Sequence, residues 1–196
     1  MPKDPGYLKR LKEYAKGEFT TADFIAVERE MYDASDRASV VVLATLTEDA
    51  IELLLMNNMR GDLSAEDRRL LFGFDGVAGT FSSKVHLAYA MKLIGPKTRR
   101  ELDLIRTLRN TFAHAKKAIR FDVPEVSAVC AELRFPDEPD ADRPSGPLDL
   151  EAQKLSEPWC EARVRFHTSC RTLTNRMLLR TLGDVLSGAT QSSRLP

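Results

Sequence analysis

Apolar residues recur along this chain at the three- and four-residue spacing of helices, and alternating strand patterns are scarce. The most apolar stretch, residues 40–56, carries apolar side chains all round a helix, which is typical of a helix inside a bundle. Phe166, Cys170 and Leu173 are spaced four and three residues apart, on one face of a last helix over about 158–187. The pattern predicts an all-α bundle of six to eight helices.

Polar residues just before the apolar stretches predict where three helices begin. A Ser, Thr, Asp or Asn at such a position accepts a hydrogen bond from a free backbone N–H group in the first helical turn. The expected caps are Thr20 for a helix over about 21–32, Ser35 or Asp36 for a helix to about 57, and Ser64 for a helix over about 65–72.

Three glycines within residues 73–79 predict a loop, which lacks the Gly-Lys-Ser/Thr ending of a phosphate-binding loop. A helix over about 80–94 follows, and we expect Gly95 to end it in a left-handed conformation. The connection to the next helix is so short that the two helices should form an antiparallel hairpin.

Two capping boxes are expected in the second half of the chain, each pairing a cap residue with the third residue of its helix. Thr98 with Glu101 would open a helix to about 115. Asp122 with Glu125 would open a helix to about 132, with Pro124 tolerated in its first turn.

Four prolines among acidic residues mark residues 136–157 as an acidic, proline-rich loop. The length of 196 residues suits one domain of ordinary size. We therefore expect a single all-α domain over residues 1–187, which includes this loop, and a flexible tail over 188–196.

Composition narrows the classes of function. The chain carries 29 basic and 29 acidic residues, and this balance argues against coating nucleic acid or membranes by bulk electrostatics. Three cysteines without a Cys-x-x-Cys pair, and no apolar segment behind the N-terminus, predict a cytoplasmic protein without disulfides or a membrane span. No residues have the spacing of zinc ligands and no dinucleotide fingerprint is present, so we expect no metal and no cofactor.

Arg109 is the first candidate functional residue, because it lies on the apolar stripe of its helix with Leu102, Ile105 and Phe112. A buried guanidinium without a partner is costly, so Arg109 should meet a carboxylate or reach into a cleft. The candidate carboxylates are those of the central helix, Glu48, Asp49 and Glu52.

Asn110 and His114 stand four residues apart and share a face of the same helix. They could bond backbone groups where the helix ends. Alternatively, Arg109, Asn110 and His114 could form a catalytic centre in which His114 supplies acid–base chemistry and Arg109 holds a phosphate. His167, on the last helix, is expected at the surface.

The sequence Arg109-Asn110-Thr111-Phe112-Ala113-His114 resembles the Arg-x4–6-His motif of the HEPN superfamily. The wider set of residues 76–84, 87–89 and 93–94 with this motif helix resembles the mannitol operon repressor (MltR) family, and more loosely the resemblance extends over 36–186. It implies a helical bundle, a homodimer, and a transcriptional regulator that acts through protein partners or indirect nucleic-acid contacts.

The HEPN resemblance implies an alternative, a metal-independent endoribonuclease, as in the toxin of a two-gene system, with Arg109 and His114 acting on RNA. Residues 97–120 hold eight basic side chains against two acidic ones, a surplus that would suit RNA phosphates. The same residues could equally be solvated helix faces, so both functions stay open from the sequence.

Overall fold

A computed structural model of the chain describes residues 6, 10, 20–135 and 158–191. Within these ranges it contains seven helices and no strand, which confirms the all-α prediction. The helices are α2 (Thr21–Glu30), α3 (Asp36–Asn57), α4 (Ala65–Phe72), α5 (Phe81–Ala90), α6 (Pro96–His114), α7 (Pro124–Ala131) and α8 (Glu161–Gln191).

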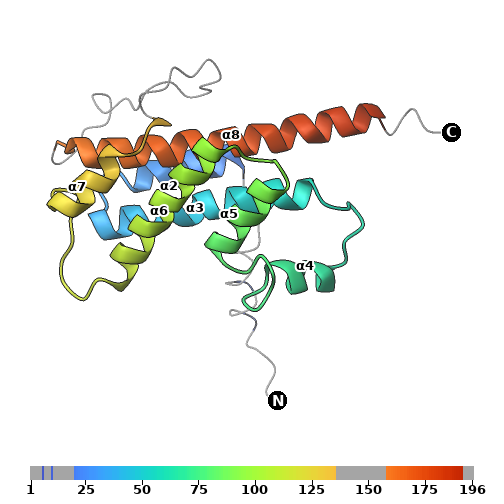
Figure 1. Cartoon of the computed structure of the whole chain (residues 1–196), viewed down its shortest axis with the longest axis horizontal. Coiled ribbons are helices and arrows are strands. Elements are labelled where there is room, and N and C mark those ends of the chain that lie inside the picture. The colour runs from blue at the N-terminus through green and yellow to red at the C-terminus, as the bar shows by residue number, and fades with distance from the viewer. Residues whose placement is uncertain (1–5, 7–9, 11–19, 136–157, 192–196) are drawn as a thin grey trace.

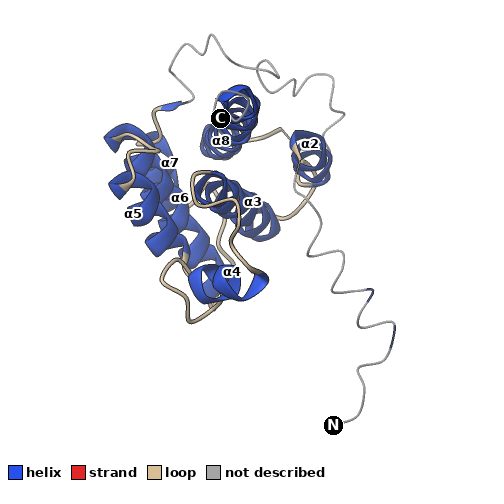
Figure 2. Cartoon of the chain, turned by 90° about the vertical axis from the view of Figure 1, so that its right-hand side faces the viewer, coloured by secondary structure: helices blue, strands red, loops and turns tan. Residues whose placement is uncertain are grey.

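The long helices α3 and α8 pack along each other and form the centre of the bundle (Figure 1). Helices α5, α6 and α7 lie on one side of this pair and α2 lies on the other (Figure 2). Because α3 packs against α5, α6 and α8, the all-round apolar pattern of its sequence is explained.

Aromatic rings join the second half of the chain to this centre. Phe112 of α6, Phe121 of the α6–α7 connection and Phe166 of α8 are all buried. The ring of Phe121 lies 5.6 Å from each of the other two, between centroids. Buried pairs at this spacing stabilise a core beyond the area they bury, and here they fix α6 and α8 around the connection.

The three predicted N-terminal caps are present. Thr20 and Ser64 each accept the backbone N–H of the Asp three residues on, and each Asp bonds back to complete a capping box. Ser35 accepts the N–H of Ala38 at the start of α3. Local side-chain chemistry therefore sets the beginning of these helices, as the sequence indicated.

The expected end of the 80–94 helix and the expected start of the helix that follows it are wrong. Gly95 has a φ of −87° and is the N-cap of α6, whose first residue is Pro96. The left-handed residue is Lys92, with a φ of 59°, and α5 has already ended at Ala90. Proline fixes a helical φ at the first position, so α6 begins there without a side-chain cap.

The two later capping boxes are also absent. Glu101 is 2% exposed and accepts hydrogen bonds from the backbone N–H of Arg134 and from Ser169, so it serves a tertiary contact. Helix α7 is capped by Val123 without a side-chain bond, while Asp122 pairs with Arg120 at 3.3 Å.

Helix α8 begins at Glu161 and reaches Gln191, beyond the expected end at 187. The acidic loop predicted over 136–157, and residues 192–196 of the predicted tail, lie outside the described residues. The extent of the single domain therefore stays a prediction.

Candidate functional site

The structure places Arg109 and Asn110 together on α6. The Arg109 guanidinium donates a hydrogen bond to the Asn110 side-chain oxygen at 3.0 Å. It also lies 3.8 Å from a carboxylate oxygen of Glu48, one of the three partners that the sequence suggested. With 34% of its side chain exposed, Arg109 is half-buried, so it both contacts α3 and retains access to solvent.

His114 lies apart from this pair in a single chain. It is the last residue of α6 and is exposed. Because α6 is continuous through residue 114, five residues turn the chain by about 140° from Arg109 to His114. One copy of the chain does not bring the two side chains onto one face.

The buried cation beside Glu48 is Lys84, a residue that the sequence reasoning missed. Its ammonium group lies 2.9 Å from Glu48 and 2.7 Å from Glu52, and only 7% of its side chain is exposed. Burial lowers the pKa of Lys84, but its hydrogen bonds to Glu52 and Glu48 outweigh burial and the pKa is raised. A lysine at helical spacing between Phe81 and Ala88, both buried, was the available signal.

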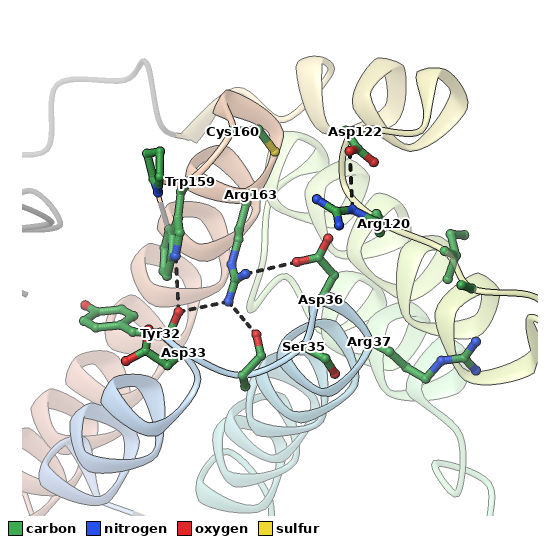
Figure 3. A pocket seen from close by; sticks show the side chains of 14 residues that line it. Tyr32, Asp33, Ser35, Asp36, Arg37, Arg120, Asp122, Trp159, Cys160 and Arg163 are labelled. Carbon is green, nitrogen blue, oxygen red and sulfur yellow. Dashed lines mark hydrogen bonds and ion pairs between the residues drawn. The ribbon is translucent and has the colours of Figure 1, made fainter. Parts of the chain in front are cut away.

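A second group of polar residues surrounds a cavity of about 530 Å³, where the α2–α3 connection, the α6–α7 connection and the start of α8 meet (Figure 3). Its charged lining residues come from all three segments and are Asp33, Asp36, Arg37, Arg120, Asp122 and Arg163. Three acids against three arginines leave the lining without net charge.

Arg163 of α8 holds these three segments together, and we call the place where they meet the junction. Its guanidinium donates to Asp36 at 3.0 Å and to the carbonyl groups of Met31, Tyr32 and Ala34 at 2.9–3.1 Å. It also stacks over the ring of Trp159 at 4.6 Å. Burial lowers the pKa of Arg163, while Asp36 opposes that shift.

The other charged residues of the cavity also contact the protein itself. Arg37 donates to the carbonyl groups of Ala115 and Lys117, at 2.9 and 3.0 Å. Asp36 uses its second carboxylate oxygen to accept the N–H of Phe121 at 2.9 Å. These contacts tie the N-terminus of α3 to both neighbouring segments, so the geometry supports a structural junction.

His167 lies directly beneath this junction and is fully buried, so the expectation that it lies at the surface is wrong. Its Nε2 lies 2.6 Å from the Ser39 hydroxyl, and its ring is 4.2 Å from that of Trp159. Burial lowers the pKa of His167 well below its usual value, and the nearby Arg163 lowers it further. The imidazole is therefore neutral in the folded protein.

A neutral buried histidine makes stability depend on pH. The unfolded chain binds a proton at His167 below about pH 6.5 and the folded chain does not, so this contribution to stability falls as the pH falls. We expect the destabilisation caused by His167→Gln to shrink by about 2 kcal/mol between pH 7.5 and pH 5, as measured by urea unfolding. A destabilisation that is constant with pH would contradict the neutral imidazole.

Glu28 provides a control, because its contribution to stability should change with pH in the opposite direction to that of His167. It is 1% exposed, and burial raises its pKa to about 7 against the opposing effect of Arg171. The folded chain thus binds the extra proton between about pH 4.5 and 7, and this contribution to stability is lost as the pH rises. Glu28→Gln should gain stability relative to wild type with rising pH, whereas His167→Gln should lose it.

No three His, Cys, Asp or Glu residues gather as a metal site in the part of the chain that the structure describes. No helix among the described residues is long and apolar enough to cross a membrane.

Together, the fold and the junction define an all-α bundle built on a long α3–α8 pair. No protein-family model and no curated protein matches the sequence. Among solved structures, a chain in the X-ray structure of the MtlR–HPr complex from Escherichia coli is similar in fold, with a TM-score of 0.56 and 19% sequence identity. The match covers 78% of this chain and 99% of that chain. It supports the MltR-like fold predicted from the sequence.

Proposed function

We propose that this protein, which has an MltR-like fold, is a transcriptional regulator that acts by binding another protein. The observation that carries the proposal is the likeness of fold over 99% of a chain solved in a complex with HPr. We extend that partnership to this chain and propose an HPr-type protein as its partner. Homodimer formation is part of the same proposal and rests on the family resemblance.

Direct binding tests this function. Purified protein titrated with HPr from the organism that encodes it should give a saturable isotherm, with a dissociation constant on the order of micromolar, as transient interfaces can have. A matched titration with an unrelated protein of similar size and charge should give no heat of binding. Absence of binding to HPr at high micromolar concentrations would contradict the proposed function.

The ribonuclease alternative assigns Arg109, Asn110 and His114 to RNA and would need a second copy of the chain to bring His114 beside Arg109. It predicts a different result with the same samples. Total RNA incubated in EDTA would be cut to products with 2′,3′-cyclic phosphate ends, and His114→Ala would lose about 100-fold or more of that rate. Intact RNA with both proteins favours the regulator.

A further inference from the structure

Two aromatic side chains cover the buried ring of His167 beside the cavity of the junction. The centroid of the Trp159 ring lies 4.2 Å from that of His167, and the centroid of the Tyr32 ring lies 6.3 Å away. Tyr32 is 7% exposed and Trp159 is half-buried, and both line the cavity. His167 therefore lies one layer of side chains below the surface.

Hydrogen bonds from Trp159 and from the first turn of α8 hold this cover closed (Figure 3). Trp159 donates its Nε1–H to the Tyr32 carbonyl at 3.2 Å, and Arg163 donates to the same carbonyl and to two neighbouring ones. We call these four hydrogen bonds the Trp159–Arg163 contact. It attaches the start of α8 to the α2–α3 connection, in which Asp33 and Ser35 are exposed. Such a surface connection opens at a lower free energy than the helices of a core.

The surroundings of His167 fit a neutral ring and not a protonated one. Its Nε2 lies 2.6 Å from the Ser39 hydroxyl, while its Nδ1 is buried without a hydrogen-bond partner among the described residues. A neutral ring can place its one proton on Nε2, toward Ser39, whereas an imidazolium carries an N–H at both nitrogens. Protonation in the closed state would thus bury a charged ring with an unsatisfied donor, which is costly.

The charges around His167 add to this cost. Arg163, one helical turn away, acts on the ring as a like charge. Asp36 is bonded to Arg163 at 3.0 Å and Glu28 lies 3.5 Å from Arg171, so both carboxylates already have a cation. No carboxylate of the described residues forms an ion pair with His167. The titratable and charged side chains on the elements around the ring are Glu28 of α2, Tyr32 and Asp33 of the connection, Asp36 of α3, Cys160 just before α8, and Arg163, Cys170 and Arg171 of α8.

We propose that acid opens the Trp159–Arg163 contact: when His167 takes up a proton, Trp159 and the α2–α3 connection separate from the start of α8 while the rest of the bundle stays folded. The core below this place does not depend on the contact, because Phe166, Cys170 and Leu173 of α8 are buried among other helices. The device is a pH-dependent opening of the junction and does not rest on the proposed partner.

The direction of the effect follows from where the proton binds. The opened His167 binds a proton with an ordinary pKa of about 6.5 and the closed one does not, so acid favours opening below that pH. Between pH 7.5 and pH 5 the opening equilibrium should increase by about 30-fold. Glu28 cannot cause such an increase, because burial raises its pKa to about 7 and its proton uptake stabilises the closed state.

The experiment measures hydrogen exchange at the Trp159 indole N–H by NMR at several values between pH 7.5 and pH 5. Trp159 is the only tryptophan of the chain, so it gives one indole resonance, and this N–H is itself a donor of the contact. Its protection is expressed relative to free tryptophan at the same pH. We expect the protection to fall by about 30-fold over this range, and to stay below that of the amides around Ile51, which is fully buried in α3.

Two variants assign the effect to one histidine. His167→Gln should make the indole protection independent of pH. The double variant His86→Gln/His114→Gln removes the two exposed histidines and leaves His167 as the only one, so it should behave like wild type. The double variant also keeps the test valid if His167→Gln does not fold.

The outcomes separate local opening from its alternatives. Protection that is constant with pH in wild type, or that falls equally in His167→Gln, would overturn the proposal. A double variant that loses the pH dependence would assign it to an exposed histidine and would also overturn the proposal. Indole exchange as slow as that of the amides around Ile51 would mean that the contact opens only when the whole bundle unfolds, which contradicts a local device.

Discussion

Replacing Arg163 by alanine should destabilise the folded protein by about 3–5 kcal/mol, as expected when one partner of a buried charged network is removed. The guanidinium is 13% exposed, and it bonds to Asp36 and to three carbonyl groups at the end of α2 and in the α2–α3 connection. The substitution would leave Asp36 without its cation and these carbonyl groups without their donor. The measurement is the free energy of unfolding in urea at pH 7.

Two further variants separate this role from a general effect of charge. Arg163→Lys keeps the charge, but a single ammonium cannot meet acceptors on both sides of the planar guanidinium, so an intermediate loss is expected. Arg100→Ala removes an exposed pair with Glu132 and should change stability by about 1 kcal/mol or less. An Arg163→Ala variant as stable as Arg100→Ala would show that α8 does not hold the junction through this side chain.

Helix content followed from the sequence because its causes are local. The caps at Thr20, Ser35 and Ser64 need only residues three positions away, and the structure has all three. The apolar pattern of α3 likewise depends on one helix and correctly predicted its central place. The boxes at Thr98 and Asp122 failed where proline fixes the helix start and where Glu101 bonds across the fold.

The candidate sites depended on contacts between distant parts of the chain, and these were harder to predict. The sequence offered three carboxylates of the central helix as partners of Arg109, and Glu48 is the one that lies beside it. The same reasoning missed Lys84, which lies between Glu48 and Glu52. His167 was wrongly expected at the surface. It is buried against residues far away in the sequence, such as Ser39, which is 128 residues away, and no local pattern indicates such a contact. The junction around Arg163 joins three separate segments, and no local pattern identifies it.

The exposed loop shows a further limit of pattern analysis. Its three glycines correctly predicted a break between helices, but they did not indicate which side chains the loop would present. Phe74 and Val77 are apolar, so spacing alone would assign them to the core. Phe74 and Val77 are nevertheless exposed, and the close approach of Gly76 and Gly79 to neighbouring carbonyl groups is visible only in the fold.

Replacing Lys84 by methionine should also destabilise the protein by about 3–5 kcal/mol, because it removes the cation from between two largely buried carboxylates. The side chains of Glu48 and Glu52 are 12% and 28% exposed, so water can only partly replace the ammonium group. Methionine fills a similar volume, which keeps the loss from being a cavity effect. Urea unfolding of both proteins measures the difference.

Arg109→Ala is the matched control, since Arg109 approaches the same Glu48 at 3.8 Å from a position that is 34% exposed. Exposed pairs contribute about 1 kcal/mol or less, so this loss should be much smaller than that of Lys84→Met. Adding Glu48→Gln and Glu52→Gln to Lys84→Met should recover much of the stability, because the two carboxylates that lost their cation are then neutral amides. If Lys84→Met unfolds no more easily than Arg109→Ala, or if the added glutamines recover nothing, then Lys84 does not neutralise these two carboxylates.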